Sequence, residues 1–224
     1  MTDAERVMEL IRCRRSIRRF RPEPIERKTI EQLLEAASWA PSAGNRQDWM
    51  FTVVTSDDLK GRMAQAVRRR WEAIIAANRG RGFIEEVEPY ASHFADFAQA
   101  PVVIAVSCRT PDAVQEQMLG AEARATVGSF ASAAMAAQNL MLAAQANGLG
   151  SCCMTGALAA SDELLRLLEL GRRRESVCLV AIGRPALHAS GGQAESPVRP
   201  KDSGSEGPPA PPRKALDETA RFME

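Results

Sequence analysis

Two short segments near the start of the chain carry the side chains best suited to chemistry. The first is basic and contains a hydroxyl group, and the second is a loop of small and amide residues. They are Arg14-Arg15-Ser16-Ile17-Arg18 and Pro41-Ser42-Ala43-Gly44-Asn45-Arg46-Gln47. Guanidinium groups and a hydroxyl suit a phosphate, whereas amides suit the polar edge of a heterocycle. The two segments therefore indicate a site for a phosphorylated, heterocyclic cofactor.

The basic character of the chain is local. Lys and Arg number 29 and Asp and Glu 28, so the net charge of +1 would not attract nucleic acid or an anionic membrane surface. Between residues 12 and 28, however, eight basic side chains face only two acidic ones. Since this cluster lacks interleaved aromatic residues, nucleic-acid binding is the least favoured hypothesis. We expect neither a nucleic-acid partner nor a membrane.

Several chemistries find no support in the residues. The chain has two histidines, His93 and His188, without partners at a recognisable spacing, which disfavours a catalytic triad and a histidine metal site. No phosphate-binding glycine loop is present. The five cysteines show no C-x-x-C spacing and indicate reduced thiols, and no targeting segment is visible at the acidic N-terminus. We expect a cytoplasmic protein without a metal, in which any reaction depends on a cofactor.

Hydrophobic periodicity predicts the elements that position these residues. A first helix is expected from a capping box at Thr2 and Glu5 to the arginines, and a second at 30–40. A third should run from a cap at Asp57 or Asp58 to a loop at 78–82. Two more are expected, one from about 121 or 129 to 146 and one at 163–168 after a cap at Ser161. Strands are expected at 50–55, 102–108, 151–154 and 177–182. No regular element is predicted between 83 and 99. The strand at 102–108 is apolar on both faces and should be central in a covered sheet.

The C-terminal part of the chain has a different composition. Of the 24 residues from 189 to 212, 14 are Gly, Ser or Pro, which predicts a linker. The chain therefore divides into a domain at 1–188, a linker at 189–212 and a terminal segment at 213–224. A proline-rich linker is extended and would carry the terminal segment far from the domain.

Five motifs, in order along the chain, resemble those of the nitroreductase family of flavoenzymes. They are RRSIRRF at 14–20, APSAGNRQ at 40–47, AQNL at 137–140 with GLG at 148–150, GRP at 183–185, and PRKALDE at 212–218. The resemblance implies an α+β fold, a three-layer sandwich with a central mixed sheet flanked by helices. It also implies a homodimer with FMN at its interface and the C-terminal segment exchanged onto the partner subunit.

The resemblance also assigns roles to individual residues. Arg14, Ser16 and Arg213 match positions that hold the FMN phosphate, and Lys214 could share this role. Arg15 matches another cofactor contact. For both Arg14 and Arg15 the alternative is that a basic residue at a helix C-terminus satisfies the helix dipole. Arg18 resembles the residue that approaches the pyrimidine edge of the flavin, where a cation stabilises the reduced ring. Pro41, Ser42, Asn45 and Gln47 match a loop that contacts flavin from the partner subunit.

The segment Cys153-Met154-Thr155-Gly156 aligns with the loop whose backbone donates a hydrogen bond to flavin N5. We choose the Thr155 N–H as that donor, with Gly156 permitting close approach to the ring. The neighbouring thiols, Cys152 and Cys153, are more typical of packing than of redox chemistry. Gln138 and Asn139 lie in an apolar helix and could brace the core rather than touch flavin.

The resemblance implies a ping-pong cycle in which hydride passes from NADH or NADPH through flavin N5 to a small organic acceptor such as a nitroaromatic, a quinone or an activated alkene. Acceptor choice in the family depends on the variable region, here 68–99, where Trp71, Phe83, Tyr90 and Phe94 either line a lid over the flavin or pack on the core. The alternatives are a non-catalytic flavin-binding protein, a reductive dehalogenase, or an enzyme that fragments FMN to build a benzimidazole. The spacing of Glu86 and Tyr90 resembles a dehalogenase lid, but no lysine stands at the matching distance.

Overall fold

The computed structural model of the chain describes residues 1–110, 125–171, 173–186, 213–214 and 216–219. In these ranges four strands form one sheet in the order β1-β2-β4-β3, and every neighbouring pair is antiparallel. The strands are β1 (Trp49–Val54), β2 (Val102–Arg109), β3 (Gly150–Met154) and β4 (Arg174–Gly183). The four predicted strands are confirmed with small shifts of their ends.

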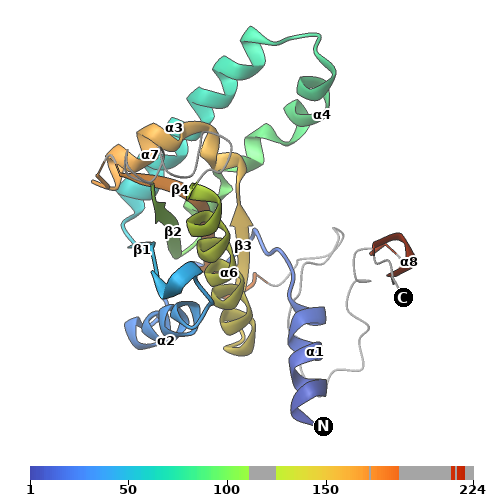
Figure 1. Cartoon of the computed structure of the whole chain (residues 1–224). Coiled ribbons are helices and arrows are strands. Elements are labelled where there is room, and N and C mark those ends of the chain that lie inside the picture. Colours follow the sequence, from blue (N-terminus) through green and yellow to red (C-terminus); the bar gives the residue numbers. More distant parts are fainter. Residues whose placement is uncertain (111–124, 172, 187–212, 215, 220–224) are drawn as a thin grey trace.

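Helices cover both faces of this sheet (Figure 1). On one face lie α2 (Arg27–Ser38) and α6 (Ala125–Ala146). On the other lie α3 (Asp57–Ala77), η2 (Ser92–Gln99), η3 (Gly156–Ala160) and α7 (Ser161–Leu167). The predicted three-layer α+β sandwich is confirmed. We expected a mixed sheet; the strands are antiparallel, and the parallel pairing in the described ranges is a single bridge between Ser16 and Ser151.

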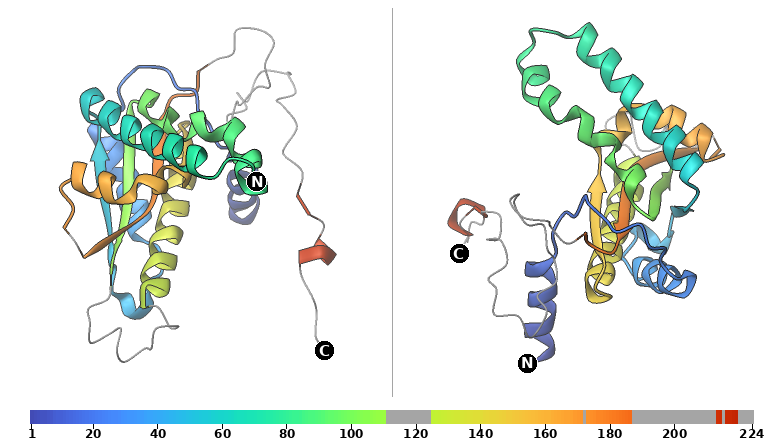
Figure 2. Two further views of the ribbon diagram at one scale, coloured as in Figure 1. Left: turned by 90° about the horizontal axis from the view of Figure 1, so that it is seen from above. Right: turned by 180° about the vertical axis from the view of Figure 1, so that it is seen from behind.

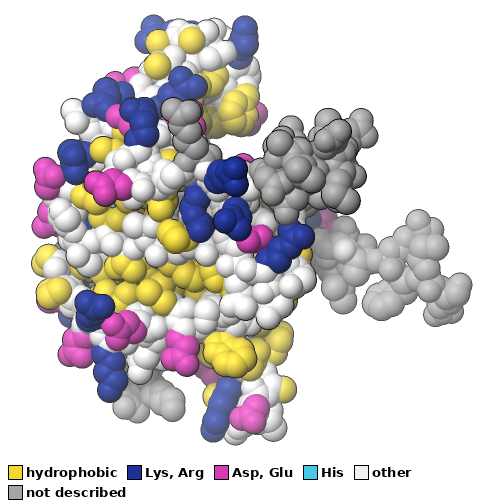
Figure 3. Space-filling model, turned by 60° about the vertical axis from the view of Figure 1, so that its left-hand side comes forward, with side chains coloured by type: hydrophobic (Ala, Val, Ile, Leu, Met, Phe, Trp, Pro, Cys, Tyr) yellow, Lys and Arg dark blue, Asp and Glu magenta, His cyan; other side chains and the backbone are white. Residues whose placement is uncertain are grey.

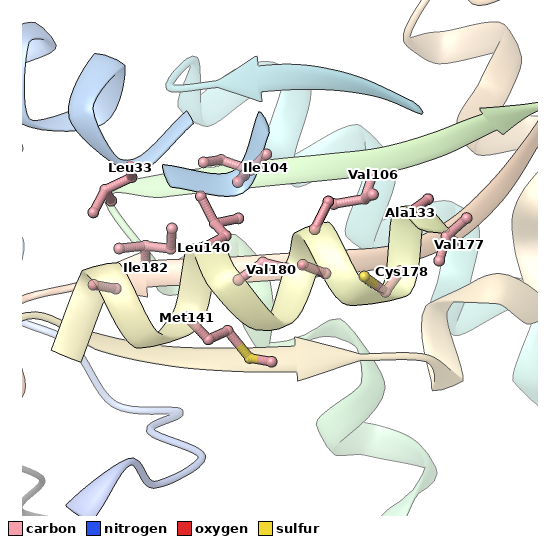
Figure 4. Packing of buried hydrophobic residues seen from close by; sticks show 14 of the residues in the cluster. Leu33, Ile104, Val106, Ala133, Leu140, Met141, Val177, Cys178, Val180 and Ile182 are labelled. Atoms are coloured by element: carbon pink, nitrogen blue, oxygen red, sulfur yellow. The ribbon is translucent and has the colours of Figure 1, made fainter. Parts of the chain in front are cut away.

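The first core lies between the sheet and the helices α2 and α6 (Figure 4). Ile104 and Val106 of β2 point toward α6, where they meet Leu140 and Ala133. Because successive side chains of a strand alternate between faces, Val103 belongs to the opposite core. All but the last residue of β2 is buried, which confirms that this strand is central and covered on both sides.

The second core joins the sheet to α3 and η2. Met63 and Val67 of α3 pack in the same cluster as Phe97 of η2. Beside it, Lys60 is only 2% exposed; its Nζ donates to the carbonyl of Ala100 at 2.6 Å and pairs with Asp57 at 2.8 Å. A buried charge is stable only when it is paired in this way. Lys60 therefore fixes the start of α3 against the end of η2.

Two predictions about helix caps were wrong, and one helix was not predicted. Helix α3 is capped by Ser56, whose Oγ accepts a hydrogen bond from the Leu59 N–H at 3.3 Å, and not by Asp57 or Asp58. Ser161 is the first residue of α7 rather than its cap. The region predicted to be irregular contains α4 (Gly82–Ala91). The sequence did not predict α4, because its first residue is a glycine and Pro89 lies near its end, and both residue types disfavour helix interiors.

Helices α1 (Asp3–Cys13) and α8 (Leu216–Thr219) lie outside the sandwich. Helix α1 begins with the predicted capping box of Thr2 and Glu5 and contains no buried residue. Helix α8 also stands apart from the sheet (Figures 1 and 2). Within the described part of the chain, no helix has the length and apolar character needed to cross a bilayer.

Candidate functional site

The basic segment is held along the outer edge of β3 by backbone pairing. The Ile17 N–H donates to the carbonyl of Ser151 at 2.9 Å, and Ser16 forms a parallel bridge with the same residue. Ile17 is 1% exposed. A Cβ added to Gly150 would lie only 2.9 Å from the Cβ of Ile17, so the two residues pack closely. Because Ile17 points inward, its neighbours Ser16 and Arg18 are exposed.

The same segment continues along the end of β4. The Arg21 N–H donates to the carbonyl of Arg184 at 2.8 Å, and Phe20 bridges Pro185. Phe20 fills the space beside Gly183, where an added Cβ would lie 2.8 Å from its ring. The predicted motifs at 14–20, 148–150 and 183–185 thus meet at one corner of the sheet.

The arginines of this segment lie differently. The Arg14 N–H donates to the carbonyl of Leu10 at 3.0 Å and ends α1, while its side chain is half-buried. Arg15 folds back on the helix end, where its Nη1 donates to the carbonyls of Arg12 and Arg14. Arg18 is exposed, and its Nη1 lies 3.4 Å from the carbonyl of Ser16. Arg15 therefore satisfies helix carbonyls in this structure, as a helix-capping role predicts.

The segment 153–156 consists of the last two residues of β3 and the two residues after it, on the strand to which the basic segment is joined. Met154 is buried in the second core, whereas Cys153 and Thr155 are exposed. In the described ranges the Thr155 N–H has no hydrogen-bond acceptor, although its carbonyl accepts from the Leu158 N–H at 2.9 Å. An exposed, unpaired backbone donor is what a hydrogen bond to a flavin ring requires. This donor set of guanidinium groups, a hydroxyl and a free amide fits a phosphorylated flavin.

Cys153 faces a second thiol on the neighbouring strand. Cys153 is opposite Val180 in the β3–β4 register, so Cys178 lies diagonally across on the same face. The hydrogen bond between Cys178 and Cys153 lowers the pKa of the Cys153 thiol to about 7; burial opposes this shift and the charge of Arg14 adds to it. The pKa of the buried Cys178 is raised, first by the same hydrogen bond and then by burial.

The predicted loop at 41–47 is held at the N-terminal end of α6, and its 3-10 turn is η1 (Ala43–Asn45). The Ala43 N–H donates to Ser132 Oγ at 3.3 Å, and the Gln47 N–H donates to Ser42 Oγ at 3.1 Å. Asn45 and Gln47 have positive φ angles of 53° and 51°, a conformation costly for residues other than glycine. The loop is therefore a built structure, with Pro41, Asn45 and Gln47 exposed.

Sequence reasoning missed the serines of α6 that support this loop. Ser132 is 3% exposed and also donates to the carbonyl of Gly128 at 2.7 Å, while Ser129 donates to Asp48 at 3.0 Å. A hydroxyl in an otherwise apolar helix was the available signal, since buried polar groups need partners. The prediction for Asn139 agrees with the structure, because its Nδ2 donates to the carbonyl of Ala36 in α2 at 3.3 Å. Gln138 is exposed.

The structure does not bring all predicted site residues together within one chain. The segments 14–18 and 153–156 meet beside β3, but the loop at 41–47 leads into β1, at the opposite edge of the sheet. Arg213 and Lys214 are exposed, and α8 directly after them stands apart from the sheet in both views of Figure 2. One chain thus presents two separate half-sites.

The aromatic residues of the variable region divide into two groups. Trp71 and Phe94 pack against the second core, with ring centroids 4.8 Å apart. Phe83 and Tyr90 are 68% and 64% exposed. The alternatives of core packing and a lid therefore apply to different residues, and only Phe83 and Tyr90 are left for contact with a ligand.

The fold places the chain in the class of three-layer α+β proteins, with a basic segment at one edge of the sheet. Comparison with known proteins identifies the family. A model of the nitroreductase family matches residues 11–184. The chain belongs to the nitroreductase family. It is 30% identical over 207 residues to 5,6-dimethylbenzimidazole synthase of Rhodobacter capsulatus, which covers 88% of this chain and 95% of that protein.

Solved structures show the same fold. A BluB-like flavoprotein from Clostridium difficile 630 has a TM-score of 0.75 at 21% identity, covering 97% of this chain and 99% of that chain. The FMN-dependent nitroreductase NfnB from Mycobacterium smegmatis, solved in complex with NADPH, has a TM-score of 0.67 at 22% identity and covers 99% of both chains. These likenesses confirm the nitroreductase fold that the motifs implied.

Proposed function

We propose that the chain is an FMN-dependent oxidoreductase that uses NADH or NADPH to reduce a small organic acceptor. The observation that carries this proposal is the bridge between Ser16 and Ser151, which joins the basic segment to β3, the strand that leads into the unpaired Thr155 N–H. When bound, FMN supplies the redox chemistry by accepting hydride from a nicotinamide and passing it to a nitroaromatic, a quinone or an activated alkene. The chain binds and orients the reactants.

Each half-site residue has a role in this proposal. Arg14 and Ser16, with Arg213 and Lys214, hold the phosphate, because charged forked donors suit a dianion. Arg15 supports this region from the end of α1. Arg18 stabilises negative charge at the pyrimidine edge. The Thr155 N–H donates to flavin N5, while Cys153, Met154 and Gly156 shape the surface against the ring.

We further propose that the working form is a homodimer. The loop at 41–47 lies at the opposite edge of the sheet from β3, so Pro41, Ser42, Asn45 and Gln47 would complete the site of a second copy. Helix α1 supports this assembly, because Val7, Met8 and Ile11 are 45% to 54% exposed in the single chain. Such apolar exposure is typical of an interface. The segment 213–224 would pack on the partner, and we expect a cytoplasmic location.

We propose no nucleic-acid partner, on the basis of the net charge of +1. Figure 3 shows basic and acidic side chains interspersed over one face of the molecule, with a band of apolar side chains between them. A nucleic-acid surface would instead present a continuous field of one sign.

A second function is favoured by one observation. The 30% identity to 5,6-dimethylbenzimidazole synthase extends over 95% of that protein, so synthesis of a benzimidazole from FMN is the alternative activity. Incubation of the protein with reduced FMN in air, followed by mass spectrometry of the small molecules, distinguishes the two. Consumption of FMN with formation of 5,6-dimethylbenzimidazole would replace the first proposal with this one.

The main proposal is tested by the colour and turnover of the purified protein. We expect a yellow protein that releases FMN on heating and oxidises NADH or NADPH faster when menadione or nitrofurazone is added. A protein that holds FMN but shows no acceptor-dependent rate is a non-catalytic flavin binder. A colourless protein that does not bind added FMN at micromolar concentration contradicts the proposal as a whole.

A further inference from the structure

The backbone of Gly156 is held by a side chain of α3. Trp71 of α3 donates its indole N–H to the carbonyl of Gly156 at 2.8 Å. An indole has one donor and no acceptor, and leaving it unpaired in a half-buried position would cost about 1–3 kcal/mol. This hydrogen bond therefore fixes the Gly156–Ala157 peptide, which directly follows the peptide that joins Thr155 to Gly156.

The residues that precede Trp71 reinforce the contact. The guanidinium group of Arg70 donates from Nε to the carbonyl of Ala159 at 3.3 Å. Arg69 pairs with Glu163 of α7 at 2.7 Å. Three consecutive residues of α3 thus hold the chain between the end of β3 and α7.

Phe94 of η2 limits the space beside the Cα of Gly156. A Cβ added to Gly156 would lie 2.3 Å from Cδ1 of Phe94, closer than any real side-chain contact. Phe94 in turn packs against Trp71, with ring planes inclined by 42°. The glycine is required here for close approach, because its own φ angle is not in the left-handed region.

We propose that Trp71 and Phe94 form a clamp that positions the Thr155–Gly156 backbone toward the flavin, so that Trp71 is a positioning residue of the reaction. The inference rests on the proposed FMN function. Trp71 acts through the Gly156 peptide and does not touch the ring. The clamp lies within the region 68–99, so this region bears on flavin chemistry through the backbone as well as through any contact with the acceptor.

The substitution Trp71→Phe tests the clamp, since it removes the indole N–H and keeps an aromatic ring beside Phe94. Trp49→Phe is the matched control: Trp49 is also half-buried, packs on Phe51 in the other core, and donates no indole hydrogen bond within the described ranges. In Trp71→Phe we expect amide exchange of residues 156–160 to accelerate about tenfold, and flavin reduction by NADPH to slow about tenfold. The Kd for FMN should change less than about threefold, because the phosphate contacts remain.

The two readouts separate the inference from the proposed function. If both variants exchange and reduce flavin alike, the clamp is wrong while the flavin function stands. If wild-type protein binds no FMN, the proposed function fails and the positioning role fails with it. Faster exchange in Trp71→Phe without any change in flavin reduction also overturns the role, because it leaves Trp71 purely structural.

A second pair of substitutions tests the packing half of the clamp. Gly156→Ala should weaken FMN binding more than about tenfold, because the new Cβ meets the ring of Phe94. In a Phe94→Ala background the same change should cost less than about threefold, as expected for coupled neighbours. Additive effects of the two substitutions would contradict the contact between Phe94 and Gly156.

Discussion

The two half-sites are built in different ways. The basic segment at 14–21 is joined to the sheet edge by backbone hydrogen bonds and by the buried side chain of Ile17. The loop at 41–47 is held by side-chain hydroxyls and adopts left-handed backbone at Asn45 and Gln47. The first half-site thus shares the stability of the sheet, whereas the second depends on a few local hydrogen bonds. If one flavin site uses both half-sites, as we propose, a second copy of the chain has to supply one of them.

Removal of the C-terminal segment should have the largest effect on this arrangement. A chain ending before Pro208 lacks Arg213 and Lys214, and loss of two charged contacts to phosphate predicts FMN binding weaker by at least about 100-fold. It should also loosen the dimer. Sedimentation and flavin content after dialysis provide the measurement. A truncated chain that remains a fully occupied dimer would show that the terminal segment does not cross to the partner.

Ile17→Ala tests whether the first half-site depends on the sheet. Ile17 is buried against Gly150, so the substitution should lower the free energy of unfolding by about 2–4 kcal/mol. Val7→Ala on the exposed face of α1 is the control and should change it by less than about 0.5 kcal/mol in the monomer. Urea unfolding at low protein concentration gives both values. Equal effects of the two would mean that the basic segment is not held by Ile17.

Arg14→Ala asks whether the same segment binds phosphate. Loss of one charged hydrogen-bond donor predicts a Kd for FMN about 10- to 100-fold higher with little change in unfolding. Arg27→Ala is the matched control, because Arg27 lies on α2 and pairs only with Glu31 among the described residues. Isothermal titration with FMN measures the difference. Undiminished affinity in Arg14→Ala would remove this residue from the site.

The contrast between the half-sites also decides how much could be read from the sequence. Strands such as β2 were predictable because their apolar side chains follow from burial on both faces. The residues of segment 14–18 could be predicted from their motif. The position of the segment beside β3 could not, because it depends on the pairing of Ser16 with Ser151, 135 positions away. Hydrophobic periodicity does not report such long-range pairing.

The parts that could not be predicted depend on tertiary contacts. Helix α4 was missed because Gly82 and Pro89 lower its intrinsic helix propensity. It continues directly into η2, and the contacts of η2 with the second core offset this low propensity. The hydrogen bond from Trp71 to Gly156 joins residues 85 positions apart in the sequence, and nothing in the local sequence of either residue indicates it. Sequence alone also left open whether Trp71 and Phe94 pack on the core, as they do.

Cys153 gives a pH-dependent probe of the first half-site. Its pKa is lowered to about 7, so the reactive thiolate should increase as the pH rises and reach a plateau above about pH 8. The alkylation rate with iodoacetamide should therefore rise about tenfold between pH 5.5 and 6.5. Cys108 should react slowly throughout, because burial raises its pKa to about 11. Peptide mapping separates the sites, and a midpoint near 9 for Cys153 would contradict the hydrogen bond from Cys178.

Ser132→Ala should give the smallest effect and tests the second half-site. The substitution removes the Oγ that accepts the Ala43 N–H, and loss of one neutral hydrogen bond predicts about 1 kcal/mol less stability. If the loop completes the site of a partner subunit, FMN affinity should also fall, by about fivefold, although Ser132 is far from the basic segment of its own chain. Mixing Ser132→Ala with Arg14→Ala subunits sharpens the test. In a mixed dimer one of the two sites combines both defects and the other has neither, so half of the flavin should bind with wild-type affinity. Uniformly weakened binding in the mixed dimer would place both half-sites in the same subunit and contradict the shared site.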